Sequence, residues 1–113
     1  MDEMSAVARL MATIEERKRN PSTRSYTSQL LVGGVPAIGA KVLEEGREIV
    51  EAAAIDDDVP REAAMIHEAA DLLYHLLVLL AFREVTWTQV EVELARRFGI
   101  SGLDEKAARQ PKN

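Results

Sequence analysis

The chain has 113 residues, a length that suits one domain and leaves little room for a second. Its formal net charge of −5 argues against a broad nucleic-acid-binding surface, and the lack of cysteine excludes disulfides, thiolate nucleophiles and cysteine zinc sites. Apolar residues make up 47% of the chain and charged residues 29%, as in soluble globular proteins. No signal peptide is expected after Met1-Asp2-Glu3, and the most apolar stretch, 72–82, is too short to cross a bilayer. We therefore expect a soluble, cytoplasmic protein.

The first part of the chain predicts two helices. Apolar residues recur there at three- and four-residue spacing, which predicts an amphipathic helix that ends at Asn20-Pro21. These residues are Val7, Leu10, Met11 and Ile14. Ser25 is expected to cap a short second helix through Leu31, which Gly33-Gly34 ends.

Three further helices are expected, over about 36–55, 60–83 and 86–98. The third begins at a proline, which fits the first position of a helix, and an acidic segment separates it from the fourth. Thr86 and Gln89 have the spacing of a capping box for the fifth. The tail from about residue 100 is polar and basic, and no segment has a convincing strand pattern. The predicted fold is all-α, with about five helices in a single domain over 1–113.

The third predicted helix carries four charged residues on one face. At about 100° per residue they fall within one arc of roughly 100°. They are Lys41, Glu44, Glu45 and Glu48. Val42, Ile49, Val50 and Ala53 occupy the opposite side, so a solvated charged surface is the alternative to a functional site.

The fourth predicted helix places two more carboxylates at the start of a stretch that is apolar nearly all round. Glu68 and Asp71 are i,i+3 neighbours on it, and two like charges there are costly unless something positive lies between them. Lys41 or an arginine could supply part of that charge. A divalent cation supplies it better, and oxygen ligands without cysteine or a histidine cluster favour Mg²⁺ or Mn²⁺ over zinc.

These residues resemble a known family. Glu44-Glu45-Gly46-Arg47-Glu48 with Glu68-Ala69-Ala70-Asp71 is similar to the metal motif of the all-α nucleoside triphosphate pyrophosphatases, the superfamily of MazG and the dimeric dUTPases. Within it, the chain is most similar to the phosphoribosyl-ATP pyrophosphatase family. Further segments that carry this resemblance are Thr13-Ile14 to Arg17, Ser25-Tyr26-Thr27 to Leu30-Leu31, Gly33-Gly34, Lys41-Val42, Ala70 to His75 and Ser101 to Ala107.

The resemblance implies a MazG-like helical bundle and hydrolysis of 1-(5-phosphoribosyl)-ATP to the corresponding AMP and pyrophosphate, the second step of histidine biosynthesis. Water would attack between the α- and β-phosphates with the help of Mg²⁺, or of Mn²⁺. The expected metal shell is Glu44, Glu45, Glu48, Glu68 and Asp71. Glu45 or Glu48 would instead orient or deprotonate the water, and the sequence does not decide between them.

Substrate phosphates also require fixed positive charge and N–H donors. Lys41 is the first candidate, with an ion pair to Glu45 as its alternative role. Further candidates are Arg17, Ser25, Thr27, Lys106 and Arg109. Ser25 could equally be a simple helix cap. His75 is interpreted as a buried, hydrogen-bonded residue rather than a ligand.

The leucines that surround the fourth predicted helix exceed what one thin subunit can cover. We therefore expect a homodimer with a shared core and with active sites near the interface. A pyrophosphatase acting on ordinary or damaged nucleotides is one alternative function, and a non-enzymatic helical dimerisation module is another. The chain has neither the length nor the cysteines for a fused zinc-dependent cyclohydrolase, the next enzyme of the pathway, which we expect to be a separate protein.

Overall fold

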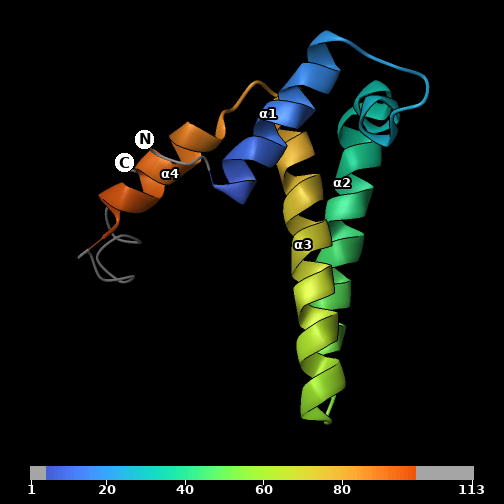
Figure 1. Ribbon diagram of the computed structural model, residues 1–113, viewed down its shortest axis with the longest axis vertical. Coiled ribbons are helices and arrows are strands. Elements are labelled where there is room, and N and C mark those ends of the chain that lie inside the picture. Colours follow the sequence, from blue (N-terminus) through green and yellow to red (C-terminus); the bar gives the residue numbers. More distant parts are fainter. Residues whose placement is uncertain (1–4, 99–113) are drawn as a thin grey trace, which may run out of the picture.

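The fold is a small arrangement of helices in which two long neighbours form the main body. The computed structural model describes residues 5–98, within which all regular structure is helical. The helices are α1 (Ala6–Arg19), α2 (Tyr26–Ala53), α3 (Asp58–Phe82) and α4 (Trp87–Arg96). Helices α2 and α3 lie side by side as a long antiparallel pair, α1 packs across one end of this pair, and α4 lies against α1 (Figure 1). The all-α prediction is confirmed.

Helix α2 contains a break where two separate helices were expected. At Gly34 the backbone has φ 66° and ψ −160°, a conformation that L side chains rarely adopt. A Cβ at this position would lie 3.4 Å from the Phe82 ring, an ordinary van der Waals contact, so it is the backbone conformation that favours glycine. Pro36 follows the break, where its missing N–H costs little. The two helical segments expected before and after this break are therefore present, and together they make up α2.

Side-chain caps set the ends of the helices. The Ser25 hydroxyl accepts from the N–H of Ser28 at the start of α2, and Thr86 forms a reciprocal capping box with Gln89 at the start of α4, as predicted. Helix α3 begins two residues earlier than predicted because Asp57 caps it. Pro60 therefore lies in the first turn, where a missing N–H is tolerated.

The core lies where α1 crosses the α2–α3 pair. Its buried apolar residues are Met11 and Ile14 of α1, Leu30 and Ile38 of α2, and Leu77, Val78 and Ala81 of α3. Lys18 donates to the main-chain carbonyl of Ala81 at 2.8 Å, which joins α1 to the last turn of α3. The beginning of α2 and the end of α3 are thereby held in fixed positions relative to each other.

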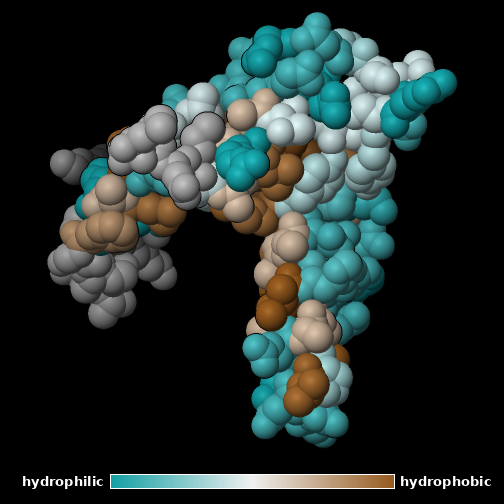
Figure 2. Space-filling model, viewed as in Figure 1, coloured by the Kyte–Doolittle hydropathy of each residue, from teal (hydrophilic) through white to brown (hydrophobic). Residues whose placement is uncertain are grey.

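Away from this core, the α2–α3 pair exposes apolar side chains (Figure 2). Leu43 and Val50 of α2 are 77% and 69% exposed, and Val59 and Ile66 of α3 are 77% and 64% exposed. Leu43 and Val50 are thus left uncovered on α2, whereas Val42 packs against the core and Ala52 is buried. By length and composition alone, α3 is long and apolar enough to cross a membrane. This differs from the sequence prediction, which considered only the apolar stretch 72–82 and found it too short. The core helix of a soluble protein meets the same criterion of length and composition.

Candidate metal site between α2 and α3

Three carboxylates converge between the two long helices. Glu45 and Glu48 lie one turn apart on α2, Glu68 lies on α3, and one carboxylate oxygen of each falls within 4.8 Å of the others. Glu45 is only 7% exposed. The acidic face of α2 therefore points at α3, which contradicts the interpretation of this face as a solvated surface.

Two oxygens of this cluster are buried without a hydrogen-bond partner within residues 5–98. They are Oε2 of Glu45 and Oε2 of Glu68. The groups nearest to them are other carboxylates, which cannot donate unless they are protonated. A buried carboxylate oxygen without a donor is costly, so the cluster requires either a proton or a cation.

The pKa values of the cluster agree with this geometry. Burial, followed by the neighbouring Glu68 and Glu48, raises the pKa of Glu45 to about 7. Burial and Glu48 also raise the pKa of Glu68. In the metal-free protein, Glu45 and Glu68 therefore hold their protons to a higher pH than an ordinary carboxyl does, and a cation would displace these protons.

A second ligand group adjoins the first through Glu68. Ligand atoms of His67, Glu68 and Asp71 also lie within 4.8 Å of one another, and Nε2 of His67 is 3.2 Å from Oδ2 of Asp71. His67 was not predicted as a site residue. Its i,i+4 spacing from Asp71 and its position next to Glu68 are the signals that could have found it.

Glu44 lies apart from both ligand groups. Its carboxylate accepts from Lys41 at 3.3 Å, and this hydrogen bond raises the pKa of Lys41. The alternative role predicted for Lys41 was a salt bridge to Glu45. The salt bridge that Lys41 forms is to Glu44, so the predicted partner is wrong. Of the five expected metal ligands, the structure brings together Glu45, Glu48 and Glu68, and sets Asp71 beside Glu68.

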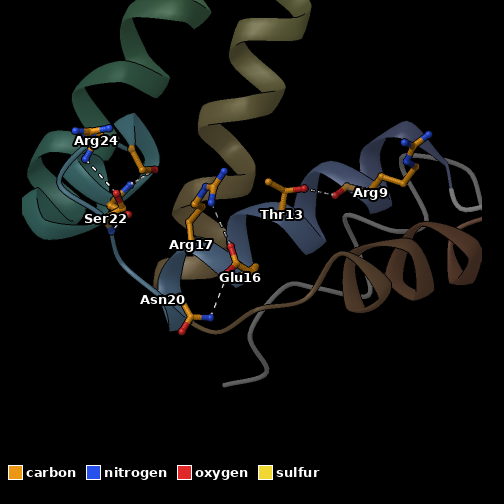
Figure 3. A network of polar contacts seen from close by, with 9 residues as sticks. Arg9, Thr13, Glu16, Arg17, Asn20, Ser22 and Arg24 are labelled. Carbon is orange, nitrogen blue, oxygen red and sulfur yellow. Dashed lines mark hydrogen bonds and ion pairs between the residues drawn. The ribbon is translucent and has the colours of Figure 1, made fainter.

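Arg17 lies near the end of α1, and Ser22 and Arg24 lie in the loop that joins α1 to α2 (Figure 3). A pocket of about 390 Å³ is lined by Thr13, Arg17, Ser22, Arg24, Ser25, Tyr26 and Thr27. The hydroxyl of Ser25 caps α2, as its alternative role predicted, and that of Thr27 bonds the Tyr74 hydroxyl. Arg17 lies 3.5 Å from Glu16. Lys106 and Arg109 lie outside the described residues.

His75 is buried beside the cluster and hydrogen-bonded, as interpreted from the sequence. Its Nε2 lies 3.1 Å from the Tyr26 hydroxyl and its Nδ1 lies 3.0 Å from the main-chain oxygen of Asp71. Nδ1 is also 3.9 Å from Oε1 of Glu45, so the ring touches the carboxylate cluster.

Comparison with known proteins identifies the family. Residues 7–98 match the family described as phosphoribosyl-ATP pyrophosphohydrolase. A phosphoribosyl-ATP pyrophosphatase of Rhodopirellula baltica is 48% identical over 104 residues, which cover 92% of this chain and 86% of that protein. The chain belongs to this family. A second such relative, from Novosphingobium aromaticivorans, is 44% identical over 109 residues and is covered to 98% of its length.

A third relative has a longer chain. The histidine biosynthesis bifunctional protein of Helicobacter hepaticus is 45% identical over 97 residues, which cover 86% of this chain but only 40% of that protein. The match to the family extends over all four helices of the described structure. The family resemblance inferred from the sequence motifs is thus confirmed.

Proposed function

We propose that this chain hydrolyses 1-(5-phosphoribosyl)-ATP to 1-(5-phosphoribosyl)-AMP and pyrophosphate, the second step of histidine biosynthesis. The observation that carries the proposal is the carboxylate cluster of Glu45, Glu48 and Glu68, with two buried oxygens that lack a donor, in a chain of this family. Residues 1–113 act as one domain in this proposal, and the protein works in the cytoplasm.

The donor set of the cluster fits a hard divalent cation. Carboxylate oxygens without thiolates are the ligands of Mg²⁺ and Mn²⁺, and the unpartnered oxygens of Glu45 and Glu68 are satisfied when a cation is bound. Glu48, beside Glu45 and Glu68, and Asp71, beside Glu68, would be the further acidic ligands of this cation. Glu44 would join the shell only after losing its bond to Lys41. His67 would add a nitrogen ligand, which Mn²⁺ accepts more readily than Mg²⁺ does.

In the proposed reaction, the oxygen of a water molecule forms a bond to the α-phosphorus while the bond from that phosphorus to the bridging oxygen breaks. Pyrophosphate leaves with the bridging oxygen, and a carboxylate takes the proton of the water. The bound cation would neutralise charge on the phosphate oxygens and lower the pKa of the water. Glu45 or Glu48 is the base that takes this proton.

The substrate carries phosphates at both of its ends, so it needs positive charge beyond the cation. Lys41 lies next to the cluster and is free to exchange Glu44 for a phosphate oxygen, because both side chains are about 40% exposed. Arg17 provides a second positive charge in the pocket of about 390 Å³ at the start of α2, where main-chain N–H groups also favour anions. Ser25 and Thr27 line the same pocket. Lys106 and Arg109 are proposed as further substrate-binding residues.

The exposed apolar residues of α2 and α3 support a homodimer. Leu43, Val50 and Ile66 are each more than 60% exposed, and a second copy would cover them. Sedimentation at increasing protein concentration tests this. A dimer that Ile66→Asp converts to a monomer is expected, and a wild-type monomer at all concentrations would contradict it.

We propose that a separate cyclohydrolase consumes the phosphoribosyl-AMP. The histidine biosynthesis bifunctional protein of Helicobacter hepaticus is a longer chain, of which the matched residues cover 40%.

The test of the proposed function is pyrophosphate release from phosphoribosyl-ATP, ATP and dUTP with Mg²⁺. Activity on phosphoribosyl-ATP that is abolished by EDTA is expected. A preference for a plain triphosphate would keep the chemistry but assign the protein to the pyrophosphatases that remove ordinary or damaged nucleotides. If the folded protein is inactive on all three nucleotides, the remaining function is that of a non-enzymatic helical dimerisation module.

A further inference from the structure

His75 is a buried titratable residue that the proposed reaction does not use. Its side chain is 8% exposed, and each of its ring nitrogens has one hydrogen-bond partner. The main-chain oxygen of Asp71 can only accept, so Nδ1 of His75 carries the hydrogen. In the neutral ring Nε2 then accepts, and the Tyr26 hydroxyl donates to it. The backbone of α3 and a side chain of α2 thus fix both the tautomer and the orientation of the ring.

The ring so held lies against Glu45. The 3.9 Å between Nδ1 of His75 and Oε1 of Glu45 is too long for a hydrogen bond, so this is a packing and electrostatic contact. The Glu45 side chain is 10% exposed and has little free space. With Oε1 against the ring, Oε2 is the oxygen left without a donor. His75 therefore limits the conformations that Glu45 can adopt toward the cluster.

The hydroxyls of Tyr26 and Tyr74 each form a hydrogen bond between the first turn of α2 and α3. Only the Tyr26 hydroxyl bonds His75, the residue that contacts Glu45. The rings of Tyr26 and Tyr74 stack with centroids 6.2 Å apart. The Tyr26 hydroxyl bonds His75, whereas the Tyr74 hydroxyl bonds Thr27. Removing either hydroxyl deletes the same chemical group from the same pair of rings. The chain thereby offers a matched pair of variants.

We propose that His75 is a positioning residue of the metal site, held by Tyr26 and by the Asp71 carbonyl so that Glu45 stays turned toward Glu48 and Glu68. This inference rests on the proposed function, because it concerns the same carboxylate cluster. Residues that orient a ligand typically change metal affinity by about 10- to 100-fold when they are altered. Tyr26 acts one contact further away, so its effect is smaller.

The test is Mn²⁺ binding to the full-length protein, measured by electron paramagnetic resonance. Tyr26→Phe is expected to weaken Mn²⁺ binding about three- to fivefold, the worth of one hydrogen bond, while Tyr74→Phe leaves the affinity unchanged. His75→Asn keeps a donor for the Asp71 carbonyl but cannot reach Tyr26, and it weakens binding about tenfold. The double variant Tyr26→Phe/His75→Asn binds no more weakly than His75→Asn alone, because both changes break the same link.

Further readouts separate positioning from a general structural role. Nitrogen-15 spectra should give the Nδ1–H tautomer for His75, with the His67 signals identified through His67→Gln. Equal losses of Mn²⁺ affinity in Tyr26→Phe and Tyr74→Phe would overturn the inference. A His75 ring that carries its hydrogen on Nε2 instead of Nδ1 would also overturn it. So would a raised KM with unchanged Mn²⁺ affinity in Tyr26→Phe, since Tyr26 would then contact the substrate.

The failure of the inference is distinguishable from that of the proposed function. Wild-type protein that binds Mn²⁺ and hydrolyses phosphoribosyl-ATP, with variants of unchanged Mn²⁺ affinity, overturns only the role of His75. Wild-type protein that binds no Mn²⁺ and releases no pyrophosphate overturns both.

Discussion

Replacing Glu45 by glutamine should stabilise the metal-free protein at alkaline pH, although the residue belongs to the proposed site. The pKa of Glu45 is about 7 in the folded protein against 4.5 for the ordinary group. Between these values the folded state binds a proton that the unfolded state has lost, so stability falls as pH rises from about 4.5 to 7. The shift corresponds to about 3 kcal/mol at pH 8 and to almost nothing at pH 4.

The Glu45→Gln variant removes this penalty, because the amide is neutral at every pH and can donate to a neighbouring carboxylate. At pH 8 in EDTA we expect its free energy of unfolding to exceed that of wild type by up to about 3 kcal/mol. This corresponds to a Tm roughly 10 °C higher. At pH 4 the two proteins should unfold together. The assay is urea and thermal unfolding at one fixed protein concentration, since a dimer would make Tm depend on it.

Saturating Mg²⁺ should reverse the order. A cation that binds the folded state at 1,000 times its Kd adds about 4.1 kcal/mol to wild type, which exceeds the advantage of the variant, whereas the variant has lost a ligand. Glu51→Gln is the control, because Glu51 lies on the same helix with a 68% exposed side chain paired to Arg47. If Glu45→Gln lowers stability at pH 8 in EDTA, or raises it equally at pH 4, the buried ionised carboxyl is not the cause.

Three further predictions concern the fold and the substrate pocket. Gly34→Ala should destabilise the protein by about 1–3 kcal/mol in urea unfolding, because alanine is strained at the positive φ of this position. Gly39→Ala, with open space around its Cβ position, should instead stabilise the protein by about 0.5–1 kcal/mol. Equal effects of the two substitutions would contradict a requirement for glycine at the break. Thr86→Ala should cost about 1 kcal/mol, because the α4 capping box is lost, and unchanged urea unfolding would refute it. Arg17→Gln should raise the KM for phosphoribosyl-ATP about tenfold, as expected for the loss of one charge-assisted contact, with kcat nearly unchanged; an unaltered KM, like that of Arg19→Gln, would remove Arg17 from the substrate site.

The helices and their caps were predictable because their signals are local. Ser25 and Thr86 have the side chains and spacing that satisfy the first N–H groups of a helix whatever the rest of the chain does. The carboxylate cluster was also predictable in outline, because helical periodicity places Glu45 and Glu48 on one face and burial next to Glu68 demands a cation.

The remaining features depend on how α2 and α3 are offset along their length. This offset follows from the turn between the helices and from Asp57 as the cap of α3, and it decides which acidic residues of α2 meet Glu68. No periodicity within one helix contains that information. The Lys41–Glu44 pair, in contrast, is an i,i+3 contact within α2. His67 was missed for another reason: the sequence argument considered oxygen ligands alone.

Gly33-Gly34 correctly predicted the break between two helical segments, which together make up α2. The side of α2 that is buried was not predictable from its pattern. Val50 is exposed because α3 covers the acidic side instead.

The proposed metal site consists of the carboxylates between α2 and α3, and the rate of pyrophosphate release from phosphoribosyl-ATP with Mg²⁺ tests it most directly. The rate is compared for wild type, Glu48→Gln and Glu51→Gln. Glu48→Gln should lose at least about 100-fold in kcat/KM, Glu51→Gln should behave as wild type, and EDTA should abolish all activity. Folded Glu48→Gln that retains the wild-type rate would contradict it.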